Sequence, residues 1–403
     1  MVATLAKPSI MKKTAFTDEV LLNELLKKTS IETRPYQNRI VGKTSSMFMG
    51  TFRDATGALE PHARSVLIES PTGSGKTVMA FSAAMHLQAL VPNLAIGWVA
   101  MRRNLLAQAQ RENRDKGFNL ERLHMISMFD QNPEELIEHK RRGGKVLMVV
   151  DEAQHDAANS MAHLHNLVEP DFILGLSATP FRVDRVKLCF DKVIRDAGIH
   201  QLIQDGYLSR FHHYSIKDWS PATVAETYLR EPERWGKSIG YFVNLEQCFQ
   251  CYHLLRAAGV RTDVVTGDSD VEAQLGAFRN NEIDFLVNCM KLTEGFDEPS
   301  LQTAFVRDSG KGCTMQMSGR VFRKFKGLKF KQVVQSGNTR WPVLRTAMPD
   351  MQYIWQEDSW KSLTVNPSLN TINQNARQAI AQIEVEMPEF IAKKMKKPKK
   401  LRF

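Results

Sequence analysis

The chain has 403 residues, of which 43% are hydrophobic and 24% charged, values typical of a globular protein with two or three domains. No apolar run is long enough to span a bilayer and the start lacks the apolar core of a signal peptide, so the sequence predicts a cytoplasmic protein. The five scattered cysteines do not favour a disulfide framework, and the single CxxC at Cys248 and Cys251 has no partner pair for zinc.

The first part of the chain alternates short apolar runs with amphipathic stretches. A helix is expected within residues 1–30, in "TDEVLLNELLKKT". The apolar runs that follow predict strands at Ser65–Glu69, Asn93–Met101, Leu123–Met128, Lys145–Val150 and Phe172–Thr179. Helical patterns between most of them predict a parallel sheet with crossover helices, in a first α/β domain over residues 31–208.

A second series of apolar runs predicts a second α/β domain over residues 209–340. Its strands are expected at Ser238–Asn244, Thr262–Gly267, Asp284–Met290, Thr303–Asp308 and Lys329–Gln335. The pattern weakens after these runs, and residues 341–390 are expected to form a C-terminal extension. For its aromatic residues, Trp341, Tyr353, Trp355 and Trp360, packing in a core is favoured over stacking on bases.

The last residues, 391–403, form a basic tail. The tail holds six Lys, one Arg and no acidic residue, so it carries most of the net charge of +10 and leaves the rest of the chain near +3. Such a run favours polyanions and is expected to be mobile. A tail that only aids solubility is the alternative.

The segment "ESPTGSGKT" at Glu69–Thr77 follows a predicted strand and opens a helix. Gly73 and Gly75 let backbone N–H groups approach phosphates, Lys76 can reach the β- and γ-phosphates, and the Thr77 hydroxyl can ligate Mg²⁺. The helix N-terminus adds a favourable dipole. The strict pattern has glycine where this chain has Ser70, which is a mild departure.

Two carboxylates end the apolar run "KVLMVVDEAQHD", which begins at Lys145. A buried pair of ionised carboxylates is costly unless a cation or hydrogen bonds meet it. Ligands of such sheets bind outside the carboxyl ends of the strands, where the phosphate loop also lies. Asp151 is therefore expected to hold Mg²⁺, partly through water, and Glu152 to orient or deprotonate the attacking water.

These segments occur in the order of the superfamily 2 helicase motifs. "RPYQ" (Arg34–Gln37), "SPTGSGKT", "DEAQH", "LSATP" (Leu176–Pro180), "TEGFDEP" (Thr293–Pro299) and "QMSGRVFR" (Gln316–Arg323) carry the resemblance, which covers residues 34–335. The details resemble the restriction-subunit-like branch, found in bacteriophages and bacteria. The resemblance implies two tandem RecA-like domains, with parallel sheets, that close around ATP and Mg²⁺.

The resemblance also assigns roles at the nucleotide. Catalysis is assigned to Lys76, Asp151, Glu152, Gln316, Arg320 and Arg323, the two arginines acting on the γ-phosphate from the second domain. Gln37 is expected to read adenine through its amide. Nucleotide contacts are assigned to Arg34, Gln37, Pro71, Thr72, Gly73, Ser74, Gly75, Lys76, Thr77, Gly295 and Asp297, and metal contacts to Thr77 and Asp151.

Coupling and nucleic-acid contacts follow from the same resemblance. Ser177 and Thr179 would couple hydrolysis to domain movement, together with Gln154, which stands where this branch more often has histidine. The polynucleotide is expected to lie across both domains and to contact Arg102, Arg103, Asn244 and Thr293. The alternative for Arg102 and Arg103 is a solvated helix start.

The sequence therefore predicts an ATP-dependent DNA helicase or translocase. An RNA helicase is the first alternative, although DEAQ and QMSGR differ from the DEAD and HRxGR sequences of RNA-remodelling enzymes. A binding scaffold that has lost hydrolysis is a further alternative, which the complete set of catalytic residues disfavours. A nuclease signature is not complete, because Ser359 stands where lysine would be required.

Overall fold

The computed structural model describes residues 19–101, 103–128, 133–155, 158–178, 189–289 and 298–363. Outside these ranges lie the basic tail and five of the predicted site residues, Arg102, Thr179, Thr293, Gly295 and Asp297. Residues 19–26 are helical, and the helix buries Leu22 and Leu26 against the first domain.

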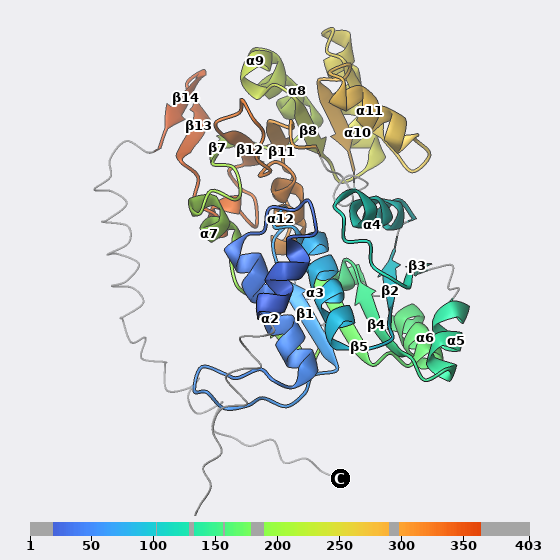
Figure 1. Cartoon of the computed structure of the whole chain (residues 1–403). Helices are drawn as coiled ribbons and strands as arrows, with labels where there is room; N and C mark the ends of the chain where they lie inside the picture. The colour runs from blue at the N-terminus through green and yellow to red at the C-terminus, as the bar shows by residue number, and fades with distance from the viewer. Residues whose placement is uncertain are drawn as a thin grey trace, which may run out of the picture.

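The first sheet of the described chain is parallel, with its strands in the order β3-β2-β4-β5-β1-β6 (Figure 1). Side chains alternate between its two faces, so Val66 and Ile68 join one core cluster and Leu67 another. The strands are β1 (Ser65–Glu69), β2 (Leu94–Ala100), β3 (Leu123–Ser127), β4 (Lys145–Val150), β5 (Phe172–Ser177) and β6 (Lys192–Ile194).

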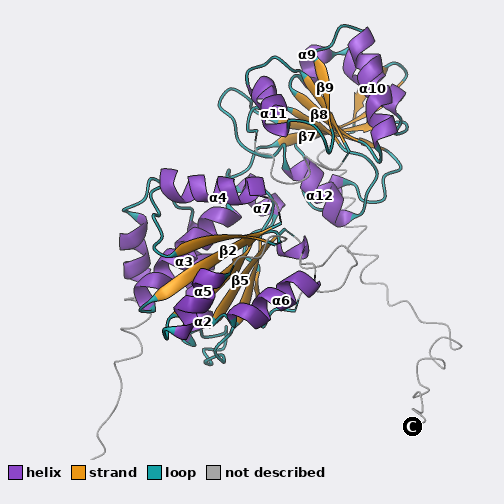
Figure 2. Cartoon of the chain, turned by 90° about the vertical axis from the view of Figure 1, so that its right-hand side faces the viewer, coloured by secondary structure: helices purple, strands orange, loops and turns teal. Residues whose placement is uncertain are grey.

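Helices cover both faces of this sheet (Figure 2). One face packs against α2 (Pro35–Met49), α3 (Lys76–Leu90) and α4 (Arg103–Asp115). The other face packs against α5 (Glu134–Arg141) and α6 (Ala158–Val168). A short helix, α7 (Ile199–Gln204), then leads to the second sheet.

The second sheet has the order β14-β13-β7-β12-β11-β8-β10-β9, in which β14 alone is antiparallel to its neighbour among the described strands. Its strands are β7 (Phe211–Ile216), β8 (Ser238–Tyr241), β9 (Thr262–Val265), β10 (Phe285–Asn288), β11 (Thr303–Phe305), β12 (Lys331–Ser336), β13 (Met351–Gln356) and β14 (Ser359–Ser362). One face packs against α8 (Pro221–Arg230), α9 (Pro232–Trp235) and α10 (Leu245–Ala257), the other against α11 (Val271–Arg279) and α12 (Lys311–Gly319).

The predicted fold class is confirmed, because two parallel sheets covered by helices follow each other along the chain as in tandem RecA-like domains. The structure adds strands β6, β7, β13 and β14, which the apolar pattern did not indicate. The last two lie in the predicted C-terminal extension and pair with the second sheet through β7. The exact domain boundaries stay predictions.

Two cysteines from the CxxC pattern belong to the core. Cys248 and Cys251 lie on the buried face of α10, and burial raises the pKa of each thiol to about 12. Thiols that resist ionisation are poor zinc ligands. The described residues contain no group of three or more His, Cys, Asp or Glu side chains that could hold a metal ion, and none of the described helices is long and apolar enough to cross a membrane. The cytoplasmic location stays a prediction.

Candidate functional site

The loop between β1 and α3 has the geometry of a phosphate-binding turn. Gly73 and Gly75 have φ values of +83° and +82°, in the left-handed region that side-chain-bearing residues rarely adopt. Lys76 is the first residue of α3, so the amino end of this helix points its N–H groups and its dipole at the loop. An anion placed there would accept hydrogen bonds from backbone N–H groups and from the Lys76 ammonium.

Residues of α2 hold this loop from behind. The Tyr36 hydroxyl and the Gln37 Nε2 both donate to the Ser74 carbonyl, at 2.6 and 2.9 Å. The Gln37 Oε1 accepts from the Arg34 N–H at 3.3 Å. Glycine is favoured at position 75, because its φ of +82° strains any side chain and a Cβ there would lie 2.6 Å from the Gln37 Nε2. Gln37 therefore contacts the phosphate loop as well as lining the pocket in which a base would lie.

Ser70, the departure from the strict motif, closes the loop upon itself. Its hydroxyl donates to the Ser74 hydroxyl at 2.8 Å, and its backbone N–H donates to the Ser177 carbonyl at 2.9 Å. The side chain is 3% exposed. Serine at this position thus adds a hydrogen bond across the turn instead of disturbing it.

The two carboxylates lie directly after β4, beside the phosphate loop. Burial, and then the neighbouring Glu152 carboxylate, raise the pKa of Asp151 to about 7, while the Lys76 ammonium opposes the shift. The raised pKa means that the protein itself does not fully compensate the charge of this carboxylate. A carboxylate and the Thr77 hydroxyl facing one cavity fit Mg²⁺, which prefers oxygen ligands.

Gln154 joins the carboxylates to β5. Its Nε2 donates to the Glu152 Oε2 at 2.8 Å, and its Oε1 accepts from the Ser177 hydroxyl at 2.6 Å. Gln154 is 4% exposed and Ser177 is fully buried. Glu152 itself has a φ of +51°, an uncommon conformation for a residue with a side chain. The amide of Gln154 therefore connects Glu152 to Ser177 by two hydrogen bonds, and its coupling role stays a prediction.

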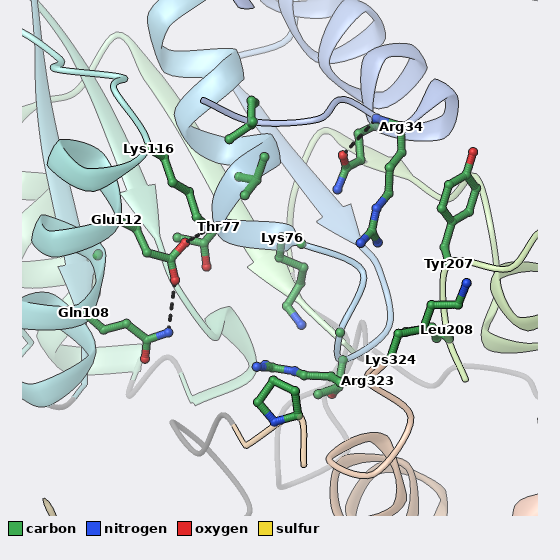
Figure 3. Close-up of a pocket in the computed structure, with 18 of the residues that line it drawn as sticks. Arg34, Lys76, Thr77, Gln108, Glu112, Lys116, Tyr207, Leu208, Arg323 and Lys324 are labelled. Atoms are coloured by element: carbon green, nitrogen blue, oxygen red, sulfur yellow. Dashed lines mark hydrogen bonds and ion pairs between the residues drawn. The ribbon is translucent and has the colours of Figure 1, made fainter. Parts of the chain in front are cut away.

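The second domain contributes two arginines to the same cavity. Arg320 and Arg323 follow α12 and line a cavity of about 690 Å³ together with Lys76, Asp151 and Glu152. Figure 3 shows Arg323 and Lys76 on this cavity. Arg320 is 7% exposed, and burial lowers the pKa of Arg323 to about 10, with the Glu112 carboxylate opposing the shift. Gln316 lies on α12 but is not among the residues that line this cavity.

Residues between the two sheets hold the arginine-bearing turn against the phosphate loop. The Ser209 N–H donates to the Phe322 carbonyl at 2.7 Å, and its hydroxyl donates to the Arg323 carbonyl at 3.2 Å. The preceding Leu208 reaches within 3.1 Å of where a Cβ on Gly73 would stand. A Cβ on Gly319 would lie 2.8 Å from the Thr72 Cβ, so this glycine allows the two domains to approach closely.

Several residues of the cavity were missed by the sequence analysis. Tyr207 is one of them: its ring centroid lies 5.3 Å from the guanidinium of Arg34, which the sequence did predict, and both residues line the side of the cavity near Gln37. On α4, Glu112 accepts hydrogen bonds from Gln108 at 3.1 Å and Lys116 at 2.7 Å (Figure 3). Neither Tyr207, which follows α7, nor α4 belongs to a motif that could have indicated a role at this cavity.

The two predicted nucleic-acid contacts that the structure describes, Arg103 and Asn244, are not among the residues that line this cavity. Arg103 is the first residue of α4, directly beyond the carboxyl end of β2, and is exposed. Asn244 follows β8 and caps α10, with its side chain accepting from the Gln247 N–H at 2.9 Å. Asn244 therefore has a structural role as a helix cap, and its side chain would have to contact nucleic acid while keeping this hydrogen bond.

Comparison with known protein families gives one match. Residues 30–182 match the family model of the type III restriction enzyme res subunit. The matched range includes the phosphate loop and the carboxylate pair and ends within the segment that follows β5.

Two curated relatives have names that describe helicases. The irc3 protein of Schizosaccharomyces pombe, named as a mitochondrial ATP-dependent helicase, is 24% identical over 75% of this chain and 57% of its own length. Helicase 22 of the Sulfolobus islandicus filamentous virus is 24% identical over 64% of this chain and 57% of its own length. The chain thus spans little more than half of these relatives.

Solved structures share the fold. The Type ISP restriction-modification enzyme LlaBIII bound to DNA covers 77% of this chain at 14% identity, with a TM-score of 0.54, over 28% of its own length. The helicase Lhr of Mycobacterium smegmatis, bound to single-stranded DNA and AMP-PNP, covers 82% at 15% identity, with a TM-score of 0.52, over 48% of its own length. At these identities the likeness shows the fold alone. The resemblance to superfamily 2 helicases of the restriction-subunit-like branch is supported by the family-model match and by the relatives that are named as helicases.

Proposed function

We propose that this chain, which has the fold and motifs of the superfamily 2 helicases of the restriction-subunit-like branch, is an ATP-dependent DNA helicase or translocase. The observation that carries the proposal is one cavity with contributions from both domains. The phosphate loop and the carboxylates line it from the first domain, and Arg320 and Arg323 line it from the second.

The residues of this cavity divide the work of phosphoryl transfer. The loop N–H groups and Lys76 bind the phosphates, and bound Mg²⁺, held by Thr77 and Asp151, supplies charge neutralisation. Glu152 positions and deprotonates the attacking water, while Gln154 fixes its carboxylate through the 2.8 Å hydrogen bond. Arg320 and Arg323 stabilise the charge that develops on the γ-phosphate.

In this proposal, closing and opening of the cleft moves the protein along a strand. The arginines reach the phosphates only when the second domain lies against the phosphate loop, as the close approach of Gly319 to Thr72 allows. Hydrolysis removes the γ-phosphate that both domains bind, and the cleft then reopens. Alternate closing and opening steps the two domains along nucleic acid, with Gln154 and Ser177 transmitting the change from Glu152.

DNA is the proposed substrate, and fork remodelling or another step of DNA replication or repair is the proposed context. The sequences "DEAQ" and "QMSGR" support DNA over RNA, and curated relatives are named as helicases. The deciding experiment measures ATP turnover with single-stranded DNA, duplex DNA, forked DNA and RNA side by side. We expect DNA to stimulate turnover; stimulation by RNA alone would make the chain an RNA helicase.

Two substitutions test the assigned chemistry. Lys76→Ala and Glu152→Gln should both abolish ATP hydrolysis, because each removes a group that acts on the transferred phosphoryl group. Lys76→Ala should also weaken ATP binding, measured with a fluorescent ATP analogue, whereas Glu152→Gln should bind ATP nearly as the unmodified protein does. Steady ATP turnover in Glu152→Gln would show that another group is the base.

A further inference from the structure

Three neighbouring strands of the second sheet end side by side. β11 pairs in parallel with β8 on one side and with β12 on the other, so the residues that follow these strands lie along one carboxyl edge. Neighbouring strands are about 4.8 Å apart, so β8 and β12 are separated by about 10 Å. The predicted nucleic-acid contact Asn244 follows β8, Arg307 follows β11, and Arg340 follows β12.

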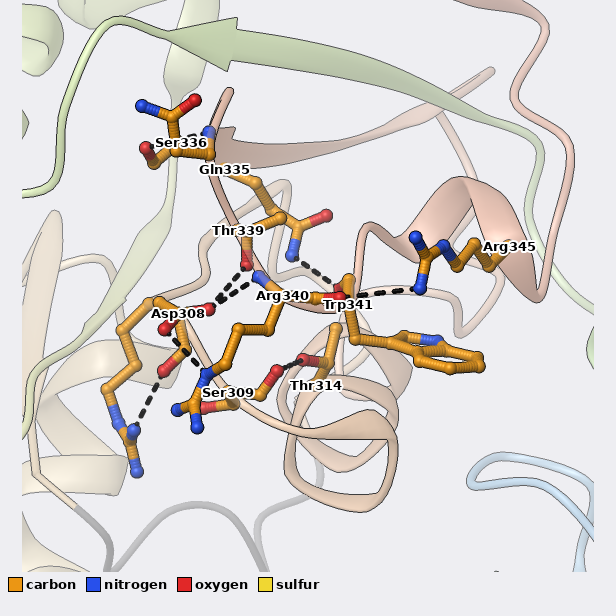
Figure 4. A network of polar contacts seen from close by, with 11 residues as sticks. Asp308, Ser309, Thr314, Gln335, Ser336, Thr339, Arg340, Trp341 and Arg345 are labelled. Carbon is orange, nitrogen blue, oxygen red and sulfur yellow. Dashed lines mark hydrogen bonds and ion pairs between the residues drawn. The ribbon is translucent and has the colours of Figure 1, made fainter. Parts of the chain in front are cut away.

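The loops after β11 and β12 are held together by one carboxylate. Asp308 accepts from the backbone N–H and the Nε of Arg340, at 2.7 and 2.8 Å, and from the Thr339 hydroxyl at 3.2 Å (Figure 4). Burial alone would raise the pKa of Asp308, but these hydrogen bonds bring it below its ordinary value. The ionised carboxylate therefore fixes the loop that carries Arg340 and Trp341.

Trp341 lies in this loop near two cations. The Lys311 Nζ and the Arg345 guanidinium lie 5.7 and 5.2 Å from its ring centroid. Its indole N–H donates to the Thr346 hydroxyl at 3.2 Å, and its carbonyl accepts from the Gln335 Nε2 at 3.4 Å. The side chain is only partly buried. Core packing, expected from the sequence for all aromatic residues of this region, thus accounts for only part of its surface.

The cluster has an excess of positive charge and an unmet donor. Four cations, Arg307, Lys311, Arg340 and Arg345, lie in it together with the carboxylate of Asp308. One nitrogen of Arg307 donates to the Asp308 carbonyl at 3.1 Å. Its Nε is buried and has no acceptor among the described residues. A buried guanidinium N–H without an acceptor is costly, and because this nitrogen is closed to solvent, a ligand would contact the other nitrogens of the guanidinium.

We infer that this cluster binds an unpaired strand of nucleic acid, continuing the path that begins at Asn244. Arg307, Arg340 and Arg345 would contact phosphates, and a base would stack on Trp341, because rigid aromatic rings beside cations suit single strands. The inference rests on the proposed function, since it extends the same nucleic-acid path. It adds a contact surface outside every motif on which that function was based.

Fluorescence anisotropy without ATP tests the inference. It compares the binding of a 20-nucleotide oligothymidylate with that of an abasic strand of equal length. Trp341→Ala should weaken binding of the thymidylate by about tenfold and leave binding of the abasic strand unchanged, because only the first strand has bases to stack. Trp341→Phe keeps an aromatic ring and should restore most of the affinity. Thermal unfolding checks that all variants are folded.

The phosphate contacts have a separate readout. The double variant Arg340→Gln with Arg345→Gln should weaken binding of both strands. It should also flatten the slope of log K against log salt by about 1.4, at roughly 0.7 per lost contact on a single strand. The matched control is Lys27→Gln with Lys28→Gln, which removes two exposed charges from the first domain and should leave the slope nearly unchanged.

The outcomes separate the two hypotheses. If the unmodified protein binds neither strand, the nucleic-acid part of the proposed function fails. If it binds both, and the Trp341 and arginine variants match it in affinity and slope, the path lies elsewhere and only the present inference is wrong. If Trp341→Ala weakened binding of the thymidylate and of the abasic strand equally, the stacking role would be overturned.

Discussion

At the scale of single residues, Gly75 meets two requirements at once. Its φ of +82° lies where side chains are strained, and a Cβ would lie 2.6 Å from the Gln37 Nε2. Gln37 cannot retreat freely, because its amide is bonded to Ser74 and Arg34. The glycine is therefore needed by the backbone and by the side chain that supports the loop from α2.

Gly75→Ala should raise the KM for ATP by about tenfold or more, because left-handed strain alone costs about 1–2 kcal/mol and the clash displaces Gln37. Steady-state ATP hydrolysis measures this. Gly57→Ala is the matched control, since Gly57 has a φ of +83° but no atom within 4 Å of the added Cβ. It should lower thermal stability slightly and leave KM unchanged. Equal KM values for both variants would contradict the argument.

The same scale shows what motifs predict well. Lys76, Asp151, Glu152, Arg320 and Arg323 were expected at one site from sequence order, and they line one cavity. Their exact catalytic roles stay predictions. Tyr207 and Glu112 reach that cavity from a linker and from a helix without a motif, so only the folded chain brings them there. The two hydrogen bonds of Gln154, to Glu152 and Ser177, could not be predicted, because residue type does not fix the orientation of an amide.

At the scale of elements, continuous apolar runs predicted the buried parallel strands, since both faces of such strands are covered. Strand β7, "FHHYSI", lies inside the second sheet but contains two histidines, and polar residues hid its strand character. Strands β13 and β14 are only partly buried, so their sequences lack the same signal. Pairing with β7 decides their structure, and pairing partners are not visible in a short sequence pattern.

One of the β7 histidines should make stability depend on pH. Burial lowers the pKa of His213 to about 4, against an ordinary value of about 6.5. The unfolded chain takes up a proton below pH 6.5 and the folded chain does not, so the free energy of unfolding should fall between pH 6.5 and 4. The full loss would be roughly 3 kcal/mol.

Urea unfolding at pH 7.5, 6, 5 and 4 measures this dependence. His213→Gln removes the titrating group, so its stability should fall less steeply over the same range. The difference between the two proteins should be constant above pH 7 and change only below 6.5. Parallel curves over the whole range would mean that His213 becomes protonated without cost in the folded state.

At the scale of the whole molecule, charge is concentrated at the C-terminal end. Deleting residues 391–403, with six Lys and one Arg, leaves the phosphate loop and the arginine-bearing turn intact. If about three of these cations contact phosphates, the deletion should flatten the salt slope on duplex DNA by roughly 2 to 3 units. ATP turnover at saturating DNA should hardly change.

Salt titrations of the full-length and shortened chains on one duplex make the comparison. The opposite deletion, of residues 1–13 with their smaller basic content, serves as a length-matched control. Superimposable slopes for the full-length chain and the C-terminal deletion would assign the tail a role other than DNA binding.

The segment Leu208–Ser209 has a consequence for assembly. It contacts the phosphate loop through Leu208 and the arginine-bearing turn through Ser209, so one short stretch of chain brings together the two halves of the nucleotide site. A covalent connection of this length gives the two halves an effective concentration in the millimolar range or above. Two separately expressed halves at micromolar concentration would lose that advantage. Each half could then fold its own sheet, but only a small fraction of the molecules would have the arginines of one half at the phosphates bound by the other.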